Sequence, residues 1–182
     1  MLYSIFAFIG LVLAVPDLAV QWAAKSHQEI NISVGATDGR LQSCLNSGFD
    51  IRYRFEIKLC STRANLLIDC RAPVILIRTL EYDPISESYR VTSDFLSDEE
   101  EPESFIASSR EEGLNSMASI RQMPLVSLGW GKDPKQQFVN VRLTSDCKGE
   151  YNETLARIGY FLSLGIVRFN EHTTGWISFA LR

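Results

Sequence analysis

Only two histidines occur in this chain, and histidine is the usual base beside a catalytic serine or cysteine. His27 follows an apolar N-terminal stretch in a polar linker, where a surface residue is expected. His172 lies between Asn170 and Thr174, a polar stretch typical of a hairpin turn. The chain also lacks the nucleophile-elbow, zinc-protease, phosphate-loop and dinucleotide motifs. We therefore predict no catalytic residue.

Two carboxylates can perform acid–base chemistry without histidine, and Glu81 and Asp83 are one candidate pair. They lie in a turn in which Pro84 presets φ, so a surface β-turn explains them better than an active site does. The acidic run from Ser97 to Glu103 lacks the spacing of cation ligands and is interpreted as a solvated loop. An enzyme that uses carboxylates is kept as a third hypothesis.

The chain has four cysteines, Cys44, Cys60, Cys70 and Cys147. No two of them show the close spacing of a zinc site, so neither a metal nor a cofactor is predicted. In an exported protein an even number of cysteines permits disulfides. Cys60 and Cys70 flank the turn between two predicted strands and could bridge them, which would leave Cys44 with Cys147. Four buried thiols that act as small hydrophobic side chains are the alternative.

Trp130 lies in a loop between Gly129 and Gly131. Its indole fits either a ligand-binding loop or an apolar plug over the core, and we favour the plug. Trp130, Tyr82 and Asp83 are also the residues that we select as a candidate partner surface.

Composition and charge limit the class of protein. The 182 residues fit one domain with a short leader, and 46% hydrophobic with 22% charged residues is ordinary globular usage. A formal net charge of −4 argues against a general nucleic-acid binder, which needs clustered lysine and arginine.

The N-terminus predicts export. Leu2 to Val15 is an uncharged apolar run of about 14 residues, shorter than the ~20 that span a bilayer. We therefore predict that residues 1–26 are a signal peptide, cleaved after Ala14 or near Ala24-Lys25-Ser26. No basic residue precedes the run, so an uncleaved anchor with Trp22 at the membrane interface is the alternative. A buried N-terminal helix is a third interpretation. Residues 27–182 would form a single extracytoplasmic domain, with membrane contact only through residues 1–26 if these are uncleaved.

The clearest structural pattern runs from Phe49 to Leu59. Apolar side chains at every second position alternate with Asp50, Arg52, Arg54, Glu56 and Lys58, which predicts a long antiparallel strand with one solvated face.

Weaker patterns indicate further elements. Strands are predicted from Ile30 to Ala36, Leu66 to Leu80 with Pro73 as an interruption, Tyr89 to Val91, Phe138 to Leu143, and Trp176 to Arg182. Leu41 to Gly48 has room for about one helical turn.

Two short helices are also predicted. A capping box of Ser109 and Glu112 begins one that carries Leu114, Met117, Ala118 and Arg121 on one face and ends at Pro124, and Asn152 begins another with Leu155, Ile158 and Leu162. The predicted fold class is mainly β, an antiparallel β-sandwich or open barrel of six to eight strands with one or two short helices.

Several segments occur in a distinctive order: Asp38–Leu41, Leu45–Gly48, Phe49–Leu59, Arg78–Pro84, Tyr89–Val91, Ser109–Glu112 and Thr174–Trp176. In this order they resemble the bacterial exported proteins of domain of unknown function family 4390, over about residues 28 to 182. The resemblance implies a small envelope protein, and it brings no established activity or catalytic residue. The chain departs from the family in having no basic residue before its apolar leader and in its four cysteines.

These observations favour a non-catalytic exported accessory domain of the bacterial envelope that binds an unknown protein partner. It would be periplasmic, or membrane-anchored and facing the periplasm. The alternative is a carrier of a lipid or apolar small molecule in the sandwich or barrel.

Overall fold

The computed structural model describes residues 17–23, 26–35, 39–62, 68–96, 102–130, 137–148 and 171–181. The apolar run Leu2–Val15, most of the acidic loop and the helix predicted after Asn152 lie outside these residues. Within the described ranges no helix is long and apolar enough to cross a bilayer.

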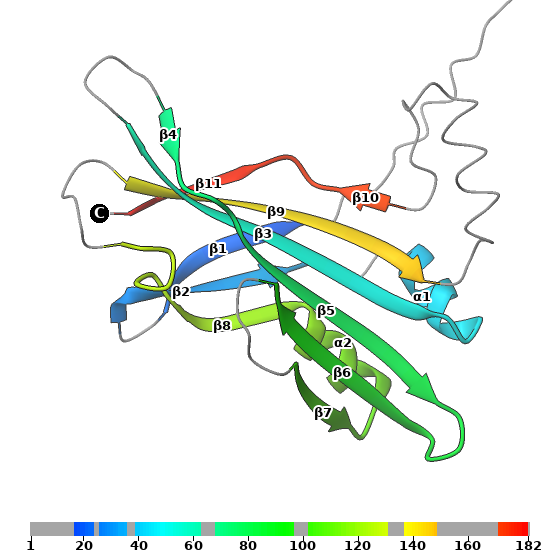
Figure 1. The fold of residues 1–182 in the computed structure, drawn as a ribbon. Coiled ribbons are helices and arrows are strands. Elements are labelled where there is room, and N and C mark those ends of the chain that lie inside the picture. The colour runs from blue at the N-terminus through cyan, green and yellow to red at the C-terminus, as the bar shows by residue number, and fades with distance from the viewer. Residues whose placement is uncertain are drawn as a thin grey trace, which may run out of the picture.

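A long antiparallel sheet forms one layer (Figure 1). Its centre is the pairing of β3 (Asp50–Thr62) with β9 (Gln137–Lys148), which run together over nearly their whole length. The strand order is β10-β9-β3-β5-β6-β7, while β4 pairs with β3 and β11 with β9. The remaining bounds are β4 (Ile68–Cys70), β5 (Val74–Asp83), β6 (Ser88–Phe95), β7 (Glu103–Ala107), β10 (Glu171–Thr173) and β11 (Ile177–Leu181).

A smaller sheet forms the second layer. It consists of β1 (Leu18–Ala23), β2 (Ser26–Val34) and β8 (Ser119–Pro124), in the order β1-β2-β8. Ile30 and Ile32 of its central strand are completely buried, so this sheet covers the apolar face of the long one.

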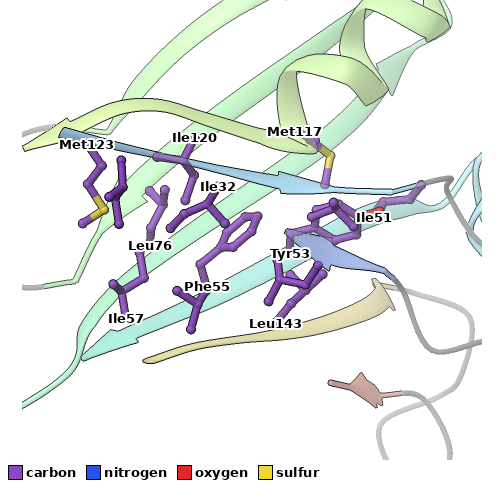
Figure 2. Close-up of a cluster of buried hydrophobic side chains, with 14 of the residues drawn as sticks. Ile32, Ile51, Tyr53, Phe55, Ile57, Leu76, Met117, Ile120, Met123 and Leu143 are labelled. Carbon is purple, nitrogen blue, oxygen red and sulfur yellow. The ribbon is translucent and has the colours of Figure 1, made fainter. Parts of the chain in front are cut away.

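The core lies between the two sheets (Figure 2). Phe55 of β3 lies between Leu143 of β9 and Leu76 of β5 in register, and all three side chains are buried. Ile32 and Ile120 face them from the smaller sheet. Burying each such side chain contributes about 1.5–3 kcal/mol, so this contact holds the layers together.

The two open sides of the sandwich are bridged differently. On one side β1 contacts β11, and Trp22 packs edge-on against Phe179 with ring centroids 5.5 Å apart. On the other side helix α2 (Arg110–Met117) contacts β5, β6, β7 and β8. The prediction of a mainly β sandwich or open barrel is confirmed.

The start of α2 is the predicted capping box. Ser109 Oγ accepts a hydrogen bond from the Glu112 N–H at 3.2 Å. The Glu112 carboxylate in turn accepts from the hydroxyl and N–H of Ser108, and these bonds lower its pKa.

The predicted end of α2 at Pro124 was wrong, because the helix stops at Met117 and Ser119–Pro124 is strand β8. Ile120 and Met123 are both buried, three residues apart as on a helix face. In β8 they share a face because Gln122 has a positive φ of 54° and the β2–β8 register shifts there. A β-bulge therefore imitates helical spacing.

Helix α1 (Gly39–Asn46) is longer than the single turn expected. Leu41, Cys44 and Leu45 are buried, so packing under β3 stabilises a second turn. Gly48 ends the segment with a φ of 77°.

Strand β1 lies inside the segment 1–26 that the sequence suggests as a leader. Leu18 and Ala23 are buried, and Trp22 packs on Phe179. Of the two cleavage positions considered, only the one after Ala14 leaves β1 in the fold. Export itself stays a prediction.

Both disulfides considered from the sequence are present. Cys44 of α1 bonds to Cys147 of β9, and Cys60 of β3 bonds to Cys70, its opposite residue in β4. The first bridges a sequence separation of 103 residues and the second a separation of 10.

The two bridges are expected to differ in their contribution to stability. In the chain-entropy model, the longer loop closed by Cys44–Cys147 is worth roughly 2 kcal/mol more than the shorter one. The double variant C44A/C147A should therefore lower the free energy of unfolding, measured by denaturant titration, more than C60A/C70A does. Equal losses would contradict this ranking.

Candidate functional site

The residues selected as a partner surface do not come together. Tyr82 and Asp83 end β5 at the β5–β6 hairpin, whereas Trp130 belongs to the segment that follows β8, and this segment lies at the opposite end of the sandwich (Figure 1). They cannot form one surface.

Tyr82 and Asp83 have local roles in the hairpin. The Tyr82 ring packs on Tyr89, with centroids 4.9 Å apart. The Asp83 carboxylate accepts hydrogen bonds from the Ile85 N–H at 2.9 Å and the Ser86 hydroxyl at 2.8 Å. These bonds lower the pKa of Asp83, as suits a turn residue that stays ionised.

Trp130 packs against the core. Its side chain is half-buried against the core, and its backbone N–H donates to the Leu125 carbonyl at 3.0 Å. This is the plug position favoured from the sequence.

His172 lies in a strand, which corrects the expected hairpin turn. It belongs to β10 and lies opposite Ser145 of β9. Strand β9 continues to Lys148, beyond the predicted end at Leu143, and so provides the edge on which β10 pairs.

The solvated side of β3 and β9 carries a cluster that we call the charged face: Arg52, Arg54, Glu56, Arg142 and Asp146. Arg52 Nε donates to the Asp146 carboxylate at 3.0 Å. Glu56, although on the solvated side, is largely buried and pairs with Arg54 at 3.3 Å and with Arg142 Nη2.

Trp176 lies over one end of the charged face. Its segment is held by Thr174, whose N–H donates to the Leu143 carbonyl at 2.8 Å and whose hydroxyl accepts from the Leu143 N–H at 3.0 Å. The indole centroid is 4.2 Å from Lys58 Nζ and 4.5 Å from Arg142 Cζ. The ring thus restrains both cations through cation–π contacts.

A hollow of about 400 Å³ opens in the charged face. Its walls are the five residues of that face together with Ile77, Thr144 and Thr173. The two threonine hydroxyl oxygens are 3.1 Å apart.

The carboxylates of Asp50 and Glu81 lie near each other where β3 begins and β5 ends. Asp50 of β3 is the in-register partner of Lys148, and Glu81 of β5 is close enough to affect its charge. Burial, and then Glu81, raise the pKa of Asp50, while Lys148, with Nζ 3.9 Å away, lowers it.

Among the described residues, strand β7 is a free edge of the long sheet. Its residues Glu103 to Ile106 are exposed, including both Phe105 and Ile106. The two edge strands of the smaller sheet are less open to pairing with another strand, because β8 has its bulge at Gln122 and β1 packs against β11.

Among the described residues no cluster of three or more histidine, cysteine or acidic side chains could hold a metal ion. The alternating charges of β3 are apparent from the sequence, but their ion-pair partners on β9 are not. It missed β7 because that strand begins in the acidic run at Glu103.

The family comparison covers most of the chain. A family model described as "Domain of unknown function (DUF4390)" matches residues 30–149. No curated protein and no solved structure matches the chain.

Replacing Glu81 tests the electrostatics around Asp50. Because Glu81 raises the pKa of Asp50, Glu81→Gln should lower that pKa, as measured by NMR titration of the Asp50 carboxyl carbon. A raised folded-state pKa means that ionised Asp50 destabilises the fold at neutral pH, and that this penalty disappears as the pH falls below its ordinary value of 3.8. The substitution should therefore relieve part of the penalty only at the higher pH. Glu87→Gln, in the exposed hairpin turn, is the matched control and should leave the Asp50 titration unchanged.

Proposed function

We propose that this chain, which belongs to the DUF4390 family, is a non-catalytic exported domain that binds a protein partner in the bacterial envelope. The matched segment begins in β2 and ends just past β9, so the family model includes strands of both sheets.

The free edge at β7 is the observation that carries this proposal. An edge strand presents unpaired N–H and C=O groups that can pair with an extended segment of another chain. Strand β7 contains no lysine, proline or bulge, and its one charged side chain, Glu103, lies at its start. Phe105 lies on the core side of the strand and Ile106 on the solvated side, so each face offers an apolar contact to an added strand.

The two disulfides support an extracytoplasmic location. Disulfides persist in oxidising compartments such as the periplasm and are rare in the cytosol. All four cysteines are paired, and the Cys44–Cys147 bridge is buried at both ends.

The carrier hypothesis has less support. An opening of about 690 Å³ lies between α2, β7 and β8, and it is lined mainly by polar side chains such as Arg78, Glu112 and Asn115. A lipid site would be lined mostly by apolar side chains. For the carboxylate enzyme, the hydrogen bonds of Asp83 favour a turn instead.

Substituting Ile106 tests the edge. Ile106 is 66% exposed, so Ile106→Lys should leave the fold intact while its charge blocks strand addition. A photo-crosslinking residue at position 106 in the native host should trap the partner, and Ile106→Lys should weaken binding of that purified partner by about tenfold or more. Amide hydrogen exchange should show new protection in β7 on binding.

Ile85→Lys is the matched control, because Ile85 is 94% exposed at the β5–β6 turn and the substitution adds the same charge. It should leave the affinity unchanged. Equal effects of the two substitutions would refute binding at β7. A self-crosslink at position 106, with a dimer that Ile106→Lys dissociates, would show that the edge pairs with a second copy and would also refute a separate partner.

A further inference from the structure

The charged face holds more positive charge than its carboxylates neutralise. Three guanidinium groups line the hollow together with only two carboxylates, Glu56 and Asp146. Lys58 lies next to Glu56 on the same side of β3 and adds another positive charge beside Arg142, at the Trp176 ring. Because the whole chain has a net charge of −4, this local excess is opposite in sign to the protein.

The pairing of these groups leaves donors unused. Both carboxylates are ion-paired, Asp146 with Arg52 and Glu56 with Arg54 and Arg142. Arg54 reaches Glu56 only through Nε, and within the described part of the chain its terminal nitrogens make no hydrogen bond. Its side chain is 45% exposed, so these N–H groups are open to a ligand.

Arg142 also has a donor that its ion pair leaves unused. One of its terminal nitrogens binds Glu56, but its Nε is buried with no hydrogen-bond partner among the described residues. An unsatisfied buried donor costs about 1–3 kcal/mol, and more when it is charged.

The hollow also has a suitable size and fixed walls. Its volume of about 400 Å³ lies at the low end of small-molecule sites. Thr144 and Thr173 of its lining contribute hydroxyl groups. Next to the hollow, the Trp176 ring contacts Arg142, which lines it, and Lys58, which does not. The segment Thr174–Trp176, one of the distinctive motifs of the sequence, thereby acquires a role at the site.

We propose that this hollow binds one small oxyanion group, a phosphate or a carboxylate. Arg54 is the principal donor, and Arg142 and Lys58 supply the remaining positive charge. The planar guanidinium fork matches the geometry of both anions. The hollow is lined by residues of β3, β5, β9 and β10, so it is separate from the β7 edge.

The test is an NMR titration of the folded chain at low ionic strength, with sodium phosphate in one arm and sodium acetate in the other. The Trp176 indole N–H, assigned with Trp176→Phe, is the reporter. Saturable binding with shifts at Trp176 and Thr144 is expected. Tighter binding of phosphate would identify a phosphate ligand, and tighter binding of acetate a carboxylate.

Matched variants separate a site from diffuse attraction. Arg54→Gln should weaken binding by about tenfold, because it removes charged hydrogen bonds. Arg121→Gln removes the same charge at an exposed position on β8, away from the hollow. At the same ionic strength it should change the affinity by less than about twofold. Glu56→Gln should tighten binding, since it releases Arg54 and Arg142 from their pair, and circular dichroism checks that it folds.

Absence of saturation in both arms would overturn the proposal, as would equal weakening by Arg54→Gln and Arg121→Gln. Ile106→Lys should leave anion binding unchanged, so this result does not depend on that of the partner experiment.

Discussion

The pairing of β3 with β9 is the interaction on which the rest of the structure depends. It runs without a register shift from Asp50 to Ser61, so every side chain on both strands has a fixed face. A slip of one residue would exchange the faces and bring arginines into the core. The same register that packs Phe55 against Leu143 on one side therefore sets Arg52 beside Asp146 and Glu56 beside Arg142 on the other.

The central strand pair has a disulfide near each end, one on β9 and one on β3. Near its start, Ile51 lies opposite Cys147, which is bonded to Cys44 of α1. Near its end, Cys60 is bonded to Cys70. The central pair of strands is thus held at both ends, and the bound elements are α1 and β4. In the chain-entropy model, each bridge stabilises the fold by lowering the conformational entropy of the unfolded chain.

Sequence patterns revealed the parts of the fold that depend on nearby residues. The alternation of Phe49–Leu59 and the capping box of Ser109 and Glu112 are local signals, and both predictions were confirmed. The end of α2 could not be found this way, because the bulge at Gln122 gives a strand the spacing of a helix.

The charged face could be predicted only in part from the sequence, because its residues are far apart along the chain. The charges of β3 were visible, but their partners Arg142 and Asp146 lie 86 and 94 residues further along the chain. A single sequence contains no local signal for that register. Trp176 likewise joins the site only because Thr174 fixes its segment against Leu143.

The half-buried side chain of Arg78 links the long sheet to the end of α2. The last turn of the helix has no basic residue of its own. Arg78 comes instead from β5, and its Nη1 donates to the carbonyl oxygens of Ser116 and Ser119, at the point where the helix ends and β8 begins. The cation that complements the helix dipole is thus part of the other layer. Fraying of the last turn of α2 would break the bonds to Arg78. Local unfolding of the end of α2 is therefore coupled to the contact between β5 and the start of β8.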